Sequence, residues 1–253
     1  MADSTPAGIL PRGDGAAIAY RQTPGAAPGV VFLPGFRSDM SGSKALALEA
    51  HCVARGQAFL RFDYQGHGES TGRFEDGTIG QWAADAAAAV TRLTEGPQIL
   101  VGSSMGGWIM LLVARAHPKR VAGLVGIAAA PDFTEDLIWE RMDEAQRATL
   151  MSAGVIHAPS QYDPVPTPIT RALVEDGRRH LLLRRPITVH CPVRLLHGMR
   201  DPDVPFARAL QLADALLSAD VEVRLIKDGD HRLSRPQDLA ILCATVDGLA
   251  GHP

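Results

Sequence analysis

A short glycine-rich turn between an apolar strand and an apolar helix is the feature that most constrains this chain. Residues 102–107 read Gly-Ser-Ser-Met-Gly-Gly, after the apolar run 98–101 and before the apolar stretch 108–114. Small residues at 102 and 106 let the backbone pass close to its neighbours without Cβ clashes. The order of strand, tight turn and helix therefore predicts that Ser104 is an exposed nucleophile in a strained turn at a strand end.

An acid and a base follow this serine along the chain, in the order that such a site requires. Asp201 lies in a polar loop just past the apolar strand 192–197. His231 lies in the loop after strand 221–227, whose alternating pattern indicates one buried face. We predict that Ser104 is the nucleophile, that His231 is the general base and then acid, and that Asp201 orients the imidazole.

Each of these residues also has an ordinary structural interpretation. Ser104 is then a turn serine, Asp201 a helix cap and His231 a solvated loop residue. Three independent residues in the required order favour the catalytic interpretation. Other carboxylates compete for the role of the acid: Asp203, Asp230 and Asp132. Asp132 follows strand 121–128, the first strand after the helix that begins at Met105. A carboxylate at that position could also reach the histidine.

Two backbone amides are predicted to form an oxyanion hole. The apolar strand 29–34 ends in a Pro-Gly turn, which should present the Phe36 N–H toward the serine. Met105 directly follows the serine and should supply the second N–H. Because both donors belong to the main chain, the side chains of Phe36 and Met105 affect the shape of the hole and not its charge.

Apolar strands alternate with amphipathic helices along the chain. This pattern predicts an α/β fold with a mostly parallel central sheet and helices on both faces. The predicted strands are 16–21, 29–34, 57–62, 98–102, 121–128, 192–197 and 221–227. The predicted helices are 42–55, 80–95, 105–117, 205–218 and 235–250. Ser234 stands three residues before Gln237, which is capping-box spacing for the last helix.

The length of the chain favours a single domain with one insertion. A chain of 253 residues with 46% apolar residues can bury one sizeable core, so we expect residues 1–253 to form one domain. About sixty residues separate strands 121–128 and 192–197, which is too long for an ordinary connection. We predict that residues 131–186 form a small helical cap that presents an apolar face to the substrate. A loop inside this cap is indicated by four prolines: Pro159, Pro164, Pro166 and Pro168.

Several side chains are candidates for contact with the substrate. The apolar candidates are Trp108, Trp139 and Met142. The alternative is that the cap residues of this set only pack the cap onto the main domain and do not contact the substrate. An acidic substrate such as a glucuronate could meet the arginines Arg178, Arg179, Arg184 and Arg185. A solvated face explains the arginines as well, and we favour this interpretation.

Composition and motifs exclude several classes of function. The balance of 25 basic against 28 acidic residues gives no electrostatic case for binding nucleic acid or an anionic membrane. No apolar run is long enough for a membrane span. Zinc and nucleotide motifs are absent, so we expect no metal or cofactor, and we interpret His67 and His197 as structural, with His67 a minor candidate for the site entrance.

The remaining expectations concern the compartment. The three cysteines, Cys52, Cys191 and Cys243, lie in apolar or periodic stretches and are predicted to be reduced core residues. The first six residues lack the basic and then apolar order of an export signal. We therefore expect a cytoplasmic protein.

Taken together, these motifs resemble the α/β-hydrolase family. The matching stretches are 32–36, 61–70, 102–107, 196–205 and 229–234, which span most of the chain from about residue 18. The chain is more specifically similar to the α/β-hydrolase-domain enzymes that remove palmitoyl groups from protein cysteines and cleave mycophenolic acid acyl glucuronide. That similarity rests on residues 35–46, 102–110, 191–199 and 230–232.

The resemblance implies an α/β-hydrolase fold and a defined set of site residues. Carried over by position, it gives the same roles to Ser104, Asp201, His231, Phe36 and Met105. The chain departs from the mammalian members of the group in two respects. Their mitochondrial leader has no counterpart here, and residues 65–68 look like a bacterial version of their loop.

From these arguments we expect a cofactor-independent serine esterase or thioesterase. Its substrate would be a small-molecule ester or thioester with an apolar acyl part, or an S-acylated protein. An acyltransferase with the same triad is an alternative, and product analysis with an added acceptor distinguishes the two. A ligand-sensing protein on a hydrolase scaffold is the third hypothesis, which failure of Ser104 to react with a fluorophosphonate probe would favour.

Overall fold

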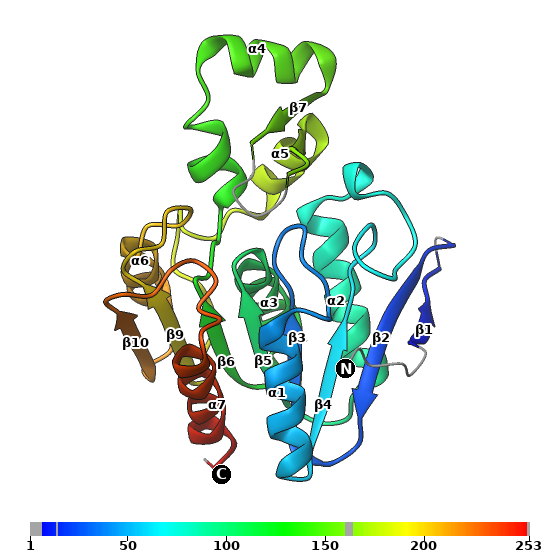
Figure 1. The fold of residues 1–253 in the computed structure, drawn as a ribbon, viewed down its shortest axis with the longest axis vertical. Coiled ribbons are helices and arrows are strands. Elements are labelled where there is room, and N and C mark those ends of the chain that lie inside the picture. The colour runs from blue at the N-terminus through cyan, green and yellow to red at the C-terminus, as the bar shows by residue number, and fades with distance from the viewer. Residues whose placement is uncertain (1–6, 14, 160–163, 252–253) are drawn as a thin grey trace.

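An eight-stranded mixed sheet forms the centre of the computed structural model, which describes residues 7–13, 15–159 and 164–251 (Figure 1). The strand order is β1-β2-β4-β3-β5-β6-β9-β10. Strand β2 pairs antiparallel with β1 and β4, and all other pairs in this sheet are parallel. The strands are β1 (Gly8–Pro11), β2 (Ala17–Thr23), β3 (Ala26–Leu33), β4 (Gln57–Phe62), β5 (Gln98–Ser103), β6 (Val121–Ile127), β9 (Val193–Gly198) and β10 (Val221–Ile226). The predicted mostly parallel sheet is confirmed.

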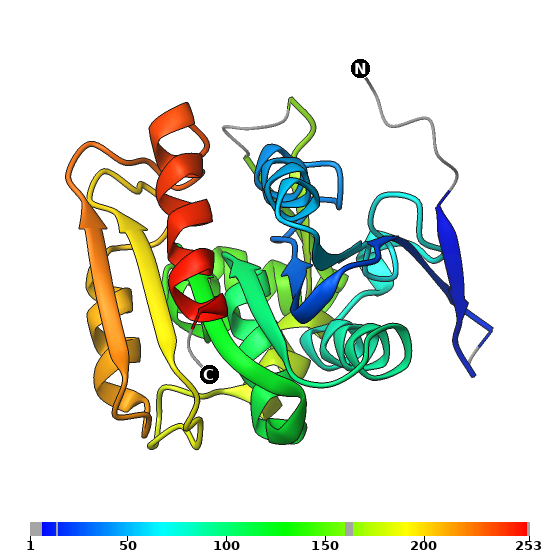
Figure 2. The same ribbon diagram turned by 90° about the horizontal axis from the view of Figure 1, so that it is seen from below.

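Helices cover both faces of this sheet (Figure 2). They are α1 (Ser43–Ala54), α2 (Ile79–Leu93), α3 (Met105–Ala116), α6 (Ala207–Ala215) and α7 (Pro236–Ala250). Alternate residues of β3 point to opposite faces: Val30 and Phe32 pack in one core cluster with α1 and α7, and Val31 and Leu33 in another with α2, α3 and α6. Because both faces are buried, the central strands are continuously apolar and do not alternate.

Two parts of the main domain differ from the predictions. Strand β1 was not predicted, because it has only four residues and ends in Pro11, and it forms an edge strand through pairing with β2. The last helix has Arg235 as its N-cap, not Ser234. Pro236 occupies the first helical position, and the Asp238 carboxylate accepts the Arg235 N–H at 3.1 Å. Ser234 instead donates its hydroxyl to the Arg232 carbonyl.

The segment 131–186 stands over the carboxyl ends of the parallel strands (Figure 1). It contains a π-helical segment η3 (Thr134–Trp139), α4 (Glu144–Ala153) and α5 (Arg171–Gly177), together with the strands β7 (Val155–Ala158) and β8 (Thr167–Thr170). The antiparallel β7–β8 pair was not predicted, since the prolines around it indicated a loop. Pro168 lies within β8 opposite His157, which is tolerated in an edge strand. Residues 160–163 of the predicted loop lie outside the described residues.

The structure bears on two further predictions, the absence of a membrane span and the state of the cysteines. Over the described residues, no helix combines the length and the apolar character needed to cross a membrane. The three cysteines are free; Cys52 is buried, and Cys191 and Cys243 are partly buried. Residues 1–6, which carry the prediction about an export signal, lie outside the described residues.

The turn around Ser104 allows a direct test of the fold. A Cβ on Gly106 would overlap the backbone carbonyl oxygens of Leu33 and Pro34, neither of which can rotate away. We expect Gly106→Ala to reduce the free energy of unfolding by roughly 1–3 kcal/mol, measured by urea denaturation. Gly248 in α7 meets nothing within 4 Å, so Gly248→Ala should stabilise the protein by about 0.5–1 kcal/mol. Equal stability of the two variants would contradict the packing argument.

Candidate active site

The candidate nucleophile Ser104 occupies a strained turn between β5 and α3. Its φ of 53° and ψ of −116° lie outside the regions that non-glycine residues ordinarily adopt. The Ser104 N–H donates to the Ile127 carbonyl at 2.8 Å, and its carbonyl accepts the Ala130 N–H at 3.1 Å. The turn is thus fixed to the end of β6 on both sides, and the side chain remains partly exposed.

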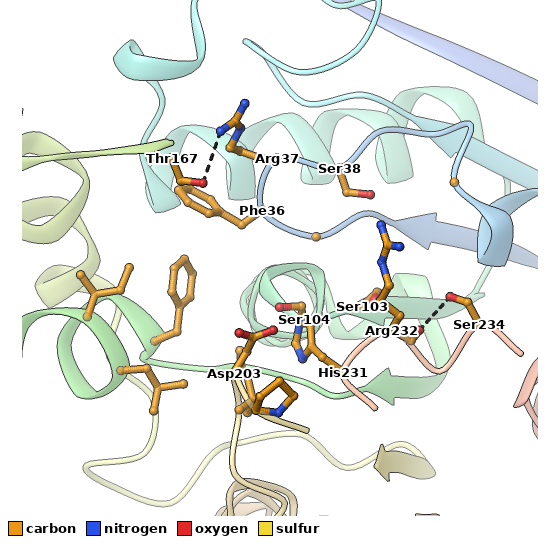
Figure 3. A pocket seen from close by; sticks show the side chains of 18 of the residues that line it. Phe36, Arg37, Ser38, Ser103, Ser104, Thr167, Asp203, His231, Arg232 and Ser234 are labelled. Atoms are coloured by element: carbon orange, nitrogen blue, oxygen red, sulfur yellow. Dashed lines mark hydrogen bonds between the residues drawn. The ribbon is translucent and has the colours of Figure 1, made fainter. Parts of the chain in front are cut away.

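The candidate base and acid meet at the same end of the sheet. His231 follows β10, Asp201 follows β9, and the His231 Nδ1 lies 2.8 Å from the Asp201 Oδ2. Figure 3 shows the side chains of Ser104 and His231 next to each other in one pocket that both of them line. The structure therefore brings together the three side chains that the sequence singled out.

The Asp201 carboxylate is fully buried, yet it is held in its ionised form. Its Oδ1 accepts the backbone N–H groups of Asp203 and Val204, each at 2.9 Å. Burial raises the pKa of Asp201, but the hydrogen bonds from His197, His231 and Val204 outweigh it and hold this pKa well below its ordinary value. A negative charge therefore faces the Nδ1 side of His231 throughout the neutral range.

A second histidine, His197, also contacts this carboxylate. Its side chain is 1% exposed, and its Nε2 lies 2.9 Å from the Val204 carbonyl and 3.3 Å from the Asp201 Oδ2. Because both neighbours are acceptors, the Nε2 carries the proton. Sequence reasoning left His197 as structural, and its position four residues before Asp201 was the available signal for a role beside the acid.

The competing carboxylates make other contacts. Asp132, fully buried after β6, accepts the N–H groups of Leu182 and Leu183 at 2.7 and 2.9 Å, and so joins the two ends of the cap. Asp230 accepts the Leu233 N–H at 2.9 Å. Asp203 lines the pocket two residues beyond Asp201. Asp201 is the carboxylate that the geometry pairs with His231.

The two predicted oxyanion donors flank the serine. Met105 is the first residue of α3, so its N–H has no acceptor within the helix. Phe36 lies in the loop after β3, and Arg37 beside it adopts a left-handed conformation with φ 55°. Phe36 and Ser104 line the same pocket, and a Cβ on Gly35, which precedes Phe36, would lie 3.5 Å from the Ser104 Cβ.

Two buried groups after β4 hold the Phe36 loop in place. The Asp63 carboxylate accepts the Met40 N–H at 2.7 Å and the Glu69 N–H at 2.9 Å, and burial raises its pKa to about 6. His67 accepts the Arg37 N–H on its Nε2 at 3.3 Å, while its Nδ1 lies 3.3 Å from the Gln65 carbonyl. His67 therefore carries its proton on Nδ1 and is neutral, since burial lowers its pKa to about 4.

His67 also belongs to an aromatic cluster around Phe36. The His67 ring lies 5.1 Å from the rings of both Phe74 and Trp82, and the Phe36 ring lies 4.9 Å from Phe74. Such edge and tilted contacts fix ring orientation as well as bury area. His67 was predicted as structural or as a lining residue; it is absent from the pocket wall and instead supports the loop that carries Phe36.

The pocket above Ser104 has a volume of about 980 Å³. Its apolar wall comes largely from the cap and includes Phe133, Leu137, Ile138 and Ile169. The predicted lining residues lie elsewhere. Trp108 is fully buried in α3 and donates its Nε1–H to the His180 carbonyl, and Met142 packs inside the cap cluster. The Trp139 ring contacts the guanidinium groups of Arg147 and Arg178, whose Cζ atoms lie 5.3 and 4.5 Å from its centroid.

The four cap arginines proposed to meet an acidic substrate are also absent from the pocket wall. Arg178 pairs with Glu135 at 2.7 Å, and Arg179 pairs with Asp176 at 2.6 Å. Arg184 pairs with Asp136, while Arg185 is solvent-exposed. Three of these arginines form ion pairs with carboxylates of the cap. These ion pairs explain their positions better than contact with a substrate does.

Asp201, Asp203 and His231 are the one group of possible metal ligands in the described residues. The Asp201 Oδ1 already accepts two backbone N–H groups, and its Oδ2 accepts His231. A metal ion at this position would have to replace the hydrogen bond between Asp201 and His231. The contacts of these donors therefore fit a triad better than a metal site.

Comparison with known proteins identifies the family. Residues 26–171 match the family described as serine aminopeptidase, S33. The Bos taurus protein named palmitoyl-protein thioesterase ABHD10, mitochondrial, is 43% identical over 242 residues, which cover 95% of this chain and 79% of the bovine protein. The chain belongs to the ABHD10 group of α/β-hydrolases. As a member of the ABHD10 group, it is a serine hydrolase.

Two solved structures agree with membership of the ABHD10 group. Mouse α/β hydrolase domain-containing protein 10 superposes with a TM-score of 0.90 at 40% identity, covering 97% of this chain and 98% of the mouse chain. A protein titled putative hydrolase from Agrobacterium vitis S4 gives a TM-score of 0.92 at 42% identity, covering 96% and 97%. The resemblance and the α/β-hydrolase fold predicted from the sequence are confirmed.

The environment of His67 predicts a pH dependence of stability. Between pH 6.5 and about 4 the unfolded chain binds a proton at His67 that the folded protein does not, so acidification favours unfolding. The full effect is about 3 kcal/mol and is reached below the folded pKa. His67→Gln keeps an acceptor for Arg37 but does not titrate, so its urea stability should fall less than that of wild type between neutral pH and pH 4.

The exposed His157 in β7 provides the matched substitution for this measurement. His157→Gln is expected to follow wild type across the same pH range. A His67→Gln variant with the same pH dependence as wild type would contradict a neutral, buried His67.

Proposed function

We propose that this ABHD10-group hydrolase cleaves carboxylic esters or thioesters with an apolar acyl part, through an acyl-enzyme on Ser104. The observation that carries the proposal is the arrangement at one sheet edge of the strained Ser104 turn, His231 and the buried, ionised Asp201. The same end of the sheet faces a pocket whose cap wall is mostly apolar. The name palmitoyl-protein thioesterase, given to the bovine relative, supports an acyl substrate.

The proposed reaction has two halves, acylation of Ser104 and hydrolysis of the acyl-enzyme. The Ser104 Oγ attacks the carbonyl carbon while His231 takes its proton, and the N–H groups of Phe36 and Met105 bind the resulting oxyanion. His231 then gives this proton to the departing alkoxide or thiolate, which leaves the acyl group on Ser104. Water attacks the acyl-enzyme, His231 takes the water's proton, and the acid is released as the Ser104 Oγ regains a proton from His231.

The Asp201 carboxylate holds His231 in the tautomer that these reaction steps need, with the proton on Nδ1. With the Nδ1–H donated to the Asp201 Oδ2, the lone pair of the Nε2 is available to the serine hydroxyl. The imidazolium formed during each half-reaction is stabilised by the ionised carboxylate. Because Asp201 is ionised well below neutral pH, it supports both roles across the physiological range.

The pocket supports an apolar acyl part. A volume of about 980 Å³ is larger than a short acyl group needs, and Phe133, Leu137 and Ile138 offer apolar surface beside Ser104. Each methylene buried there contributes about 0.8 kcal/mol. We therefore propose that the acyl chain lies against the cap and the leaving group lies toward His231.

Hydrolysis of a series of acyl esters and matching thioesters, from acetyl to palmitoyl, tests this proposal. We expect kcat/KM to rise with chain length and the Ser104→Ala variant to lose several orders of magnitude in rate. A fluorophosphonate probe should label wild type but not Ser104→Ala. Full activity of Ser104→Ala would refute the acyl-enzyme, and a rate that peaks at acetyl would refute the long acyl chain.

The identity of the acid is tested by two matched substitutions. Asp201→Asn should lower kcat about 10⁴-fold, because the amide favours the wrong tautomer of His231. Asp203→Asn removes a carboxylate from the pocket wall two residues away and should change kcat by less than tenfold, roughly the effect of a lost surface charge. The reverse ranking in steady-state kinetics would assign the acid to Asp203.

A further inference from the structure

The pocket over Ser104 is chemically divided into two ends. One end is mostly apolar and is formed by Phe36 with cap residues such as Phe133 and Ile138, although Arg37 and Thr167 lie beside Phe36 there. The other end is polar and is formed by two loops of the main domain, through Ser38, Ser43, Lys44, Arg232 and Ser234. Figure 3 shows Phe36 and Thr167 on one side, Arg232, Ser38 and Ser234 on the other, and Ser104 with His231 between them. A substrate that spans Ser104 therefore meets two different environments.

Lys44 is the residue of the polar end whose charge is least compensated. It is partly buried in the first turn of α1, and its Nζ donates to the Arg232 carbonyl at 2.6 Å. Within the described ranges, no carboxylate lies within ion-pair distance of Lys44. Partial burial of an ammonium without a carboxylate is unfavourable, which is the situation expected where a bound anion completes the site.

The surroundings of Lys44 strengthen the positive field. Burial, followed by the nearby Arg232 guanidinium, lowers the pKa of Lys44 to about 8, although Asp230 and Asp238 act in the opposite direction. Lys44 is thus still mostly charged at neutral pH. Two more cations line the pocket away from Lys44: Arg37, whose guanidinium donates to the Thr167 hydroxyl, and Arg141 of the cap; Asp203 is the one carboxylate of the described wall. This excess of positive charge stands in a chain of net charge −3.

The position of Lys44 relative to His231 decides which part of the substrate it meets. His231 protonates the leaving group, and Arg232, whose carbonyl binds Lys44, is the next residue in the chain. We propose that Lys44 and Arg232 form a subsite for an anionic group, a carboxylate or a phosphate, on the leaving-group side of the substrate. This inference rests on the proposed function and adds a specificity to it.

Pairs of substrates that differ only in the charge of the leaving group test the subsite. For a carboxylate, the pair is 4-carboxyphenyl octanoate and 4-carbamoylphenyl octanoate. For a phosphate, the pair is octanoyl-4′-phosphopantetheine and octanoyl-pantetheine. The quantity measured is the ratio of kcat/KM for the anionic and the neutral member of each pair, and the pair with the larger Lys44-dependent ratio identifies the anion.

We expect Lys44→Gln to lower this ratio roughly tenfold or more in at least one pair, since hydrogen bonds to charged groups are among the strong ones. Lys44→Arg should restore most of the ratio, and Arg232→Gln should lower it as well. Lys119, an exposed lysine beyond the opposite end of α3, provides the matched control. Lys119→Gln removes the same net charge and should leave the ratio unchanged.

Two further measurements keep the proposal testable if a variant folds poorly. In wild type, added salt should reduce the ratio, because it screens the attraction between the subsite and the anion. Calorimetric binding of the two phenyl octanoates to Ser104→Ala requires no turnover, and the carboxylate should bind more tightly.

The outcomes that overturn the subsite differ from those that overturn the proposed function. A ratio near one in wild type, or a ratio that Lys44→Gln does not change while the neutral esters are still hydrolysed through Ser104, overturns the subsite alone. A Lys44-dependent preference for a carboxylate at the far end of the acyl chain, and not on the leaving group, also overturns it. Loss of hydrolysis for every substrate overturns the proposed function, and the calorimetric comparison then decides the subsite by itself.

Discussion

The backbone conformation of Ser104 is the constraint on which the rest of this structure depends. A non-glycine residue at φ 53° and ψ −116° is unfavourable by itself and persists only where its surroundings fix it. Here the carbonyls of Leu33 and Pro34 leave no room for a Cβ on Gly106, and the backbone of Gly106 at the start of α3 leaves none for a Cβ on Gly102. The tight packing of strand against helix thus holds the hydroxyl at the sheet edge where the loops after β3, β9 and β10 converge.

Three histidines near this edge show how environment determines what one residue type can do. His231 faces an ionised carboxylate and remains partly exposed in the pocket beside Ser104, as the proposed acid–base role requires. His67, surrounded by aromatic rings and bonded through both nitrogens, is held neutral and serves as a fixed acceptor for the loop of Phe36. His197 is fully buried and donates toward Asp201. Their sequence contexts, each beside a glycine or an aspartate, look much alike.

The sequence allowed the sheet, its helices and the positions of Ser104, Asp201 and His231 to be predicted, because each depends on local order: an apolar strand followed by a polar loop. The lining of the pocket was not predictable in the same way. Trp108, Trp139 and Met142 were chosen for apolar size, but Trp108 is buried in the core beside α3, and the places of Trp139 and Met142 depend on how the cap folds onto itself. The β7–β8 pair was missed for a similar reason, since its register is fixed by contacts between strands and not by periodicity.

The two hydrogen bonds that the Asp132 carboxylate accepts from Leu182 and Leu183 have a consequence for how an enzyme of this kind can change its substrate. By holding the two ends of the cap together, they leave β6 and β9 paired with each other whatever lies between them. The intervening segment can therefore change in length or composition while the chain leaves and re-enters the sheet at the same two places, provided that contacts to the main domain such as Gly80–Asp176 and Arg208–Asp136 are kept or replaced. New substrate preferences can evolve by exchange of a single contiguous stretch of the gene, while the chemistry encoded on either side of it is inherited unchanged.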